Sequence, residues 1–216
     1  MTAGKIILEN ADYLVLDKAA GVLSQKDKSG APAVADLLQK IIPMPFLAPV
    51  HRLDRNTSGL LLLAKNSVAA KFFTEALQAG EVHRTYLAIV KGDPGSKGTI
   101  DAPLAKDEEA NEVSVSSDGK AAITHFERIE LFPASALVKV ELETGRSHQI
   151  RAHFAHIRCA LIGDKKYAKK PWSEIFSRPA LHATQLHFPD PKTGKILQAH
   201  APMPEDMVKL KAKLKG

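Results

Sequence analysis

Residues 136–144 read ALVKVELET, and the alternation of apolar and polar side chains from Val138 to Glu143 predicts a half-buried β-strand. The apolar residues that follow, Ile150, Phe154 and Ile157, recur at helical spacing and predict a helix over residues 148–157. The strand leads into this helix through Gly145 and Arg146. Because the rest of the chain mixes strands and helices without a regular βαβ repeat, the sequence indicates an α+β fold.

Further elements are predicted on both sides of this stretch. Apolar runs bounded by turn residues predict strands at residues 13–16, 60–64, 84–90, 181–188 and 196–200. Helical spacing predicts helices at residues 34–41 and 67–79, the second capped by Ser67 and ended by Gly80. A last helix is expected from Glu205. The lysines at every odd position of residues 209–215 also leave a strand or a disordered basic tail open.

The composition is that of an ordinary globular protein. The 216 residues are 44% hydrophobic and 25% charged, and no low-complexity linker divides them, so we expect one domain over residues 1–216. Cys159 is the only cysteine, which excludes an intramolecular disulfide framework and a Cys-rich zinc module and fits a reducing compartment. No signal-peptide core and no membrane-length apolar run is present, so we expect a cytoplasmic protein without a membrane partner.

The net charge of +6 favours anionic partners only weakly. Its distribution is more informative, because residues 144–172 contain seven basic residues and one acidic residue, Asp164. Two interpretations of this segment remain open. It could contact phosphates, or it could be an ordinary solvated face.

The common cofactor motifs are not found. The sequence contains no Gly-Lys-Ser/Thr phosphate loop and no dinucleotide-binding glycine motif after a strand, so we expect no nucleotide cofactor. His148, His153 and His156 are spaced by five and three residues, which differs from the i, i+4 pair of a helical zinc site. We therefore expect no metal. A metal-dependent hydrolase that uses these histidines is the alternative, and it would bind zinc.

A polar segment, HRLDRNTSG at residues 51–59, is the strongest candidate for chemistry. It places two arginines around Asp54, directly before the apolar strand at residues 60–64. A carboxylate is ionised at neutral pH, so it can act as a nucleophile without a neighbouring base, and a guanidinium can hold it in position. The alternative is a structural Asp–Arg pair in a turn that leads into the strand.

Three segments, in order, resemble the motifs of the RluA-type pseudouridine synthases. His51-Arg52-Leu53-Asp54 with the following TSGLL resembles the HRLD box, and RTYLAIVKG at residues 84–92 resembles the tyrosine motif. TGRSHQIRAH at residues 144–153 resembles the third motif, with GDKKY at 163–167 and LHA at 181–183 beyond it. The resemblance covers about residues 6–203 and leaves a basic C-terminal segment at 205–216. Because it begins within the first ten residues, we expect no N-terminal S4 domain.

Several positions depart from the family pattern. Lys18-Ala19-Ala20-Gly21 lacks the proline that usually follows this lysine, and Ser147 stands in place of the usual threonine. Arg158-Cys159-Ala160 replaces the glycine and proline that commonly precede the Gly-Asp pair. None of these changes removes a catalytic group, but the last could alter RNA contacts.

The resemblance implies an enzyme that isomerises selected uridines of rRNA or of a tRNA stem-loop to pseudouridine, without metal or organic cofactor. The implied fold is a single α+β catalytic domain with a large bent, mostly antiparallel mixed sheet flanked by helices and loops. We expect it to act as a monomer. A non-catalytic RNA-binding protein that retains the same fold is the alternative.

Site residues are implied in the same way. Asp54 would be the catalytic nucleophile, Tyr86 would pack against the target base, and Arg146 would pair with the Asp54 carboxylate. Arg52 would enter the RNA stack or fill the space that the extruded uridine leaves. The expected RNA-binding residues are Arg52, His51, Arg55, Ile150, Arg151, Lys165 and Lys166.

Overall fold

The computed structural model describes residues 2–216, which divide into two compact units. Unit 1 runs to Arg84 and continues from Ala183 to Pro202, and unit 2 comprises Thr85–His182 and Met203–Gly216. Two strands, β5 (His83–Lys91) and β11 (Leu181–Pro189), begin in one unit and end in the other. The expected single domain over residues 1–216 therefore stays a prediction.

Unit 1 is built on one run of paired strands. Their order is β1-β2-β4-β11, with β3 paired to β4 and β12 paired to β11. Their bounds are β1 Gly4–Glu9, β2 Tyr13–Lys18, β3 Ala48–Pro49, β4 Ser58–Ala64 and β12 Ile196–His200. All seven residues of β4 are buried, which explains its uninterrupted apolar sequence.

Two helices accompany these strands. Helix α2 (Ser67–Gln78) buries Ala69, Phe73 and Ala76 in the core of unit 1, where the Phe73 ring meets the Tyr13 ring edge to face at a centroid distance of 6.0 Å. The shorter helix α1 (Val34–Gln39) buries Val34 and Leu38. The expected cap of α2 was wrong by one residue, because the side chain that accepts from the Ala69 N–H belongs to Asn66.

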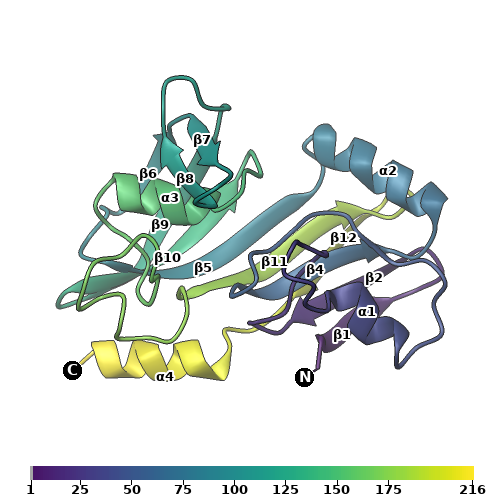
Figure 1. Cartoon of the computed structure of the whole chain (residues 1–216), viewed down its shortest axis with the longest axis horizontal. Coiled ribbons are helices and arrows are strands. Elements are labelled where there is room, and N and C mark those ends of the chain that lie inside the picture. Colours follow the sequence, from purple (N-terminus) through teal and green to yellow (C-terminus); the bar gives the residue numbers. More distant parts are fainter. Residues whose placement is uncertain (1) are drawn as a thin grey trace. The chain divides into compact units, whose positions relative to one another are not determined.

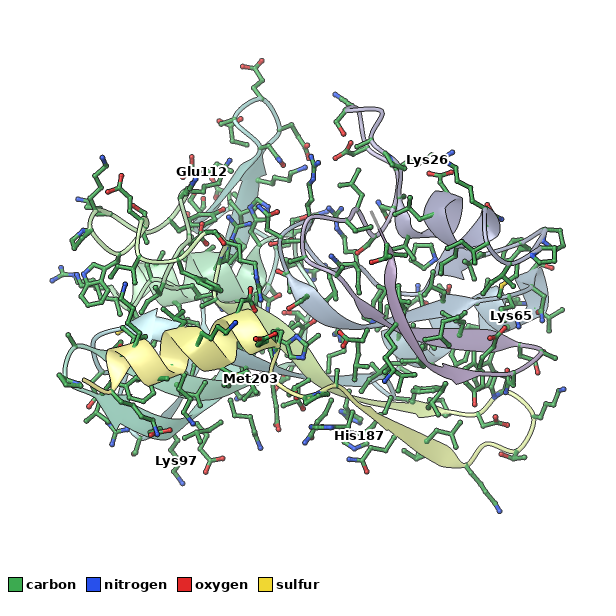
Figure 2. The ribbon with its side chains drawn as sticks, turned by 90° about the horizontal axis from the view of Figure 1, so that it is seen from below. Lys26, Lys65, Lys97, Glu112, His187 and Met203 are labelled. Carbon is green, nitrogen blue, oxygen red and sulfur yellow. The ribbon has the colours of Figure 1, made fainter. Side chains whose placement is uncertain are left out.

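Unit 2 contains a second run of antiparallel strands, ordered β5-β10-β9-β6. The bounds are β6 Lys97–Asp101, β9 Ile123–Phe132 and β10 Ser135–Leu142. A separate hairpin is formed by β7 (Leu104–Asp107) and β8 (Glu112–Val115). Figure 2 shows Glu112 on this hairpin and Lys97 on β6 at opposite ends of unit 2.

Helices α3 (Gln149–His156) and α4 (Glu205–Leu214) pack on opposite faces of the unit 2 strands (Figure 1). Phe154 of α3 contacts Phe126, whereas α4 packs with Leu137 of β10. Successive side chains of a strand point to opposite faces, so Leu137 and Val140 of β10, three residues apart, lie on opposite faces. Phe126 pairs with Val140 and therefore shares its face, which is the face that α3 covers. The basic tail thus forms a helix over Glu205–Leu214 and not a strand, and this helix buries Met207 and Leu210.

The predicted α+β class is confirmed by the ten-stranded sheet and the four helices. Every strand pairing whose register is described is antiparallel. Strands β1 and β3 and the four strands of residues 97–132 were not predicted. No helix in residues 2–216 is both long enough and apolar enough to span a bilayer.

Candidate active site

Asp54 lies at the start of a tight turn that leads into strand β4. The Thr57 N–H donates to the Asp54 carbonyl at 3.0 Å and closes the turn over Arg55 and Asn56. Asp54 is half-buried, whereas Arg52 and Arg55 are exposed. The turn therefore presents one carboxylate between two solvated guanidinium groups at the end of a fully buried strand.

Buried side chains of unit 1 hold the backbone of this turn in place. The Ser24 hydroxyl donates to the Leu53 carbonyl at 2.8 Å and accepts from the Leu53 N–H at 3.0 Å. The Lys18 ammonium is fully buried and donates to the carbonyls of Ala19, Val22 and Arg55 at 2.9–3.2 Å. Because a buried ammonium needs such acceptors, Lys18 fixes the loop beside Asp54.

His51 is part of this scaffold. It is buried, and its Nε2 accepts from the Leu62 N–H of β4 at 3.2 Å. Burial, together with the charge of Arg84, lowers the pKa of His51 to about 3. The imidazole is therefore neutral near pH 7. The expected RNA contact of His51 stays a prediction.

Tyr86 is held by strand β5 of unit 2. It stands opposite Val140 of β10 in the antiparallel ladder, and 4% of its surface is exposed. Its backbone neighbours on β5 are fixed by the same ladder, so the strand and not a loop sets the position of the ring.

Arg146 lies in the loop between β10 and α3. Its guanidinium Nε donates to the Ala121 carbonyl at 3.1 Å, and its backbone N–H donates to the side-chain oxygen of Gln149 at 2.9 Å. The residue is exposed. Arg146 therefore presents its charge at the surface from a loop that is anchored on both its side-chain and backbone atoms.

The basic segment after α3 is only partly a free cationic surface. Arg151 forms a two-pronged ion pair with Asp164, at 2.7 Å from Nε and 2.9 Å from Nη2, and its guanidinium lies 5.0 Å from the centre of the Tyr167 ring. The Lys166 ammonium donates to the carbonyls of Ala110 and Asn111 in the β7–β8 turn. Lys165 is exposed.

The expected RNA-binding residues differ in exposure, and their contacts with RNA stay predictions. Arg151 is 9% exposed and committed to Asp164, and Ile150 is 4% exposed on α3 beside the core. With His51, these two residues belong to the interior of their units. Arg52, Asp54 and Arg55 share one loop of unit 1, whereas Tyr86, Arg146, Lys165 and Lys166 belong to unit 2.

The three histidines of the alternative metal site do not converge as ligands. His153 is fully buried, and its two ring nitrogens contact the Thr124 hydroxyl and the Ala102 carbonyl, both at 2.9 Å. Burial lowers the pKa of this imidazole. His148 Nδ1 contacts the Tyr167 hydroxyl at 3.0 Å. Over residues 2–216, no group of three or more His, Cys, Asp or Glu side chains is arranged to hold a metal ion.

Two residues of this region escaped the sequence analysis. Lys18 was noted only for the missing proline after it, and Gln149 only as part of a helix and of the third motif, without a role of its own. The sequence did contain a signal for Gln149. Gln149 and His153 are polar residues at positions i and i+4 of a helix that buries six of its eight residues. Buried polar residues on one helix face indicate an internal hydrogen-bond network.

Comparisons with known proteins identify a family and a fold. Residues 12–156 match the family model described as RNA pseudouridylate synthase. The chain is 36% identical over 228 residues to a ribosomal large subunit pseudouridine synthase D of Xanthomonas campestris, which covers 97% of this chain and 69% of that protein. It is 40% identical over 215 residues to an uncharacterised RNA pseudouridine synthase of Bacillus subtilis, with 95% and 71% covered.

Two solved structures share the fold. Human RNA pseudouridylate synthase domain containing 4 superposes with a TM-score of 0.80 at 22% identity, covering 97% of this chain and 92% of that chain. Human RNA pseudouridylate synthase domain containing 1 gives a TM-score of 0.77 at 24% identity, covering 92% and 82%.

Proposed function

The chain belongs to the RNA pseudouridylate synthase family, and we propose that it isomerises selected uridines of ribosomal or transfer RNA with Asp54 as its catalytic nucleophile. The observation that supports this role most directly is the turn at residues 54–57. The half-buried carboxylate belongs to Asp54, and hydrogen bonds from Lys18 and Ser24 fix the backbone on both sides of this residue. Such a rigid mounting is what a nucleophile requires, because misplacement by 1 Å can cost about a hundredfold in rate.

The reaction itself fits a site with one carboxylate. The bond between N1 of uracil and C1′ of ribose breaks, C5 joins C1′, the C5 proton leaves and N1 gains a proton, so no water is consumed. Glycoside hydrolases, by contrast, generally use a second carboxyl group to activate water or protonate the leaving group. Asp54 is the only acidic residue in the segment at residues 51–59, as an isomerase that must avoid hydrolysis would require.

The other proposed roles follow the family motifs. Tyr86 packs against the target base, Arg146 pairs with the Asp54 carboxylate during catalysis, and Arg52 enters the RNA stack. A uridine must leave its stack to be reached, at a cost of a few kcal/mol, and these contacts would offset part of that cost. The exposure of Arg52 and Arg146 supports their access to RNA.

We propose that Arg52, Arg55, Lys165 and Lys166 contribute to RNA binding. Exposed cations can neutralise phosphates, whereas the buried His51, Ile150 and Arg151 serve the scaffold. Ribosomal RNA of the large subunit is the first substrate to test, because several similar proteins carry that name. A tRNA stem-loop is the second.

The decisive experiment maps pseudouridine in total RNA from cells with and without the gene. Asp54→Asn removes the nucleophile but keeps the size of the side chain, so we expect loss of one or more signals that wild type restores and this variant does not. The matched control, Asp118→Asn, changes an exposed aspartate of unit 2 and should restore the signals fully. Restoration by Asp54→Asn would contradict the assigned nucleophile.

The same variants distinguish the proposed enzyme from the alternative, an RNA-binding protein that catalyses no reaction. Affinity of purified wild type and Asp54→Asn for the mapped RNA should agree within a few-fold, while only wild type forms product. If wild type forms no pseudouridine in any RNA pool yet binds RNA, the binding role replaces the catalytic one.

A further inference from the structure

Gln149 is buried at the start of α3, and its side-chain amide makes four hydrogen bonds. Its oxygen accepts from the Arg146 N–H at 2.9 Å and from the Thr144 hydroxyl at 2.8 Å. Its nitrogen donates to the Ile123 carbonyl at 2.9 Å and to the Thr124 hydroxyl at 3.0 Å. With 2% of its surface exposed, this amide uses its full set of donors and acceptors inside the protein.

The direction of every bond in this network is fixed. The Ala102 carbonyl can only accept, so Nε2 of His153 carries the imidazole proton and Nδ1 accepts from the Thr124 hydroxyl. The Thr124 oxygen is then available to accept from the Gln149 amide nitrogen. The amide oxygen must therefore point toward Arg146, and a flipped amide would set two acceptors against each other.

The network ends at the loop that carries Arg146. The Gln149 side chain reaches back three residues to the Arg146 N–H, while the Gln149 N–H donates to the Arg146 carbonyl at 3.3 Å. The Thr144 hydroxyl ties the other side of the loop to β9, because it accepts from the Ile123 N–H at 3.0 Å. Two side chains, Gln149 and Thr144, thus connect the loop to β9, and each of them both donates and accepts.

From this geometry we infer that Gln149 is a positioning residue of the reaction, which fixes the Arg146 loop through the buried network of Thr124, Thr144 and His153. The inference rests on the proposed role of Arg146 in catalysis. Gln149 itself faces the protein interior and does not touch RNA. Its loss should therefore lower kcat and leave the affinity for RNA nearly unchanged.

Gln149→Glu is the sharpest test, because it changes one amide nitrogen to oxygen. The carboxylate can still accept from the Arg146 N–H, but it places a second acceptor against the Ile123 carbonyl. We expect kcat at pH 8 to fall at least tenfold, with KM for RNA within about twofold of wild type. Protonation restores one donor, so kcat of this variant should rise relative to wild type as the pH falls from 8 to 6.

The control is Gln198→Glu, the same change at an exposed glutamine of β12, which should behave as wild type at each pH. An unchanged kcat of Gln149→Glu at pH 8, a loss that appears in KM alone, or a loss that acid does not relieve would overturn the inference. If Gln149→Glu does not fold, two variants of Thr144 test the inference in its place. Thr144→Val should lower kcat and Thr144→Ser should retain it, and equal values would reject the positioning role.

A second readout does not depend on activity. Hydrogen exchange of the Arg146 backbone amide should be at least tenfold faster in Gln149→Met than in wild type, because its acceptor is lost. Equal exchange would refute the anchoring. If Asp54→Asn stays active, or if wild type makes no pseudouridine, the proposed function fails, while this exchange measurement still reports on the network alone.

Discussion

At the scale of single residues, buried His51 makes stability depend on pH. Its pKa is about 3 in the folded protein because of burial and the charge of Arg84, and near 6.5 in the unfolded chain. As the pH falls below 6.5, the unfolded chain binds a proton that the folded protein rejects, so this contribution is present above pH 6.5 and is lost toward pH 3. Between pH 7 and 4.5 the free energy of unfolding should fall by roughly 2–3 kcal/mol from this residue.

Urea unfolding at the two pH values measures this loss. His51→Gln has no imidazole to titrate, so the difference in unfolding free energy between pH 7 and 4.5 should be smaller than in wild type. His83→Gln, at an exposed histidine of β5, serves as the control. A pH dependence of His51→Gln equal to that of wild type would show that this imidazole titrates alike in the folded and unfolded states.

The residues of the site differ in how far the sequence could identify them. Asp54, Tyr86 and Arg146 stand within recognisable motifs, so they were assigned before any geometry was known. Lys18 and Gln149 each make contacts with residues far along the chain, such as the Arg55 carbonyl, 37 positions from Lys18, and the Ile123 carbonyl, 26 positions from Gln149. No local pattern encodes such a contact, because it exists only once the strands have paired.

At the scale of elements, the cap of α2 gives a direct prediction. The Asn66 side chain accepts from the Ala69 N–H at 2.8 Å, and its amide nitrogen donates to Asp12 at 3.1 Å. Asn66→Ala should therefore lower the free energy of unfolding by about 1 kcal/mol, with the midpoint of urea unfolding as the measure. Ser67→Ala, at an exposed first helical residue, should change it by less than about half as much. The reverse order would mean that Ser67 is the cap, as the sequence suggested.

Strand prediction succeeded where the polarity of the sequence follows burial and failed where it does not. In β9 every second residue from Thr124 to Phe132 is buried or half-buried. The polar Thr124 is one of the buried residues, while the apolar Ile129 and Leu131 of the same strand are about half exposed, at 52% and 51%. An alternation rule reads burial from polarity, so it does not identify this strand.

At the scale of the whole molecule, net charge is a poor guide to the RNA-binding surface. Several basic residues of the chain form internal ion pairs: Arg178 pairs with Asp206, and Lys211 and Lys215 share Glu130. Arg151 is likewise paired with Asp164. The cations that remain accessible in the basic segment, such as Lys165 and Lys169, therefore matter more than the total of +6.

This leads to a prediction about salt. Neutralising each phosphate contributes a slope of about 0.7 to 0.9 in the fall of log affinity with log salt concentration. Replacing Lys165 and Lys169 with glutamine should therefore reduce the slope for the mapped RNA by about 1.4 to 1.8 if both contact phosphate. Binding titrations at several salt concentrations measure this. Lys71→Gln with Lys213→Gln removes the same charge from exposed positions on α2 and α4 and should leave the slope nearly unchanged, because local contacts and not net charge set it. Equal reductions in both double variants would show that RNA responds to the overall field of the protein, and the basic segment would lose its assigned role.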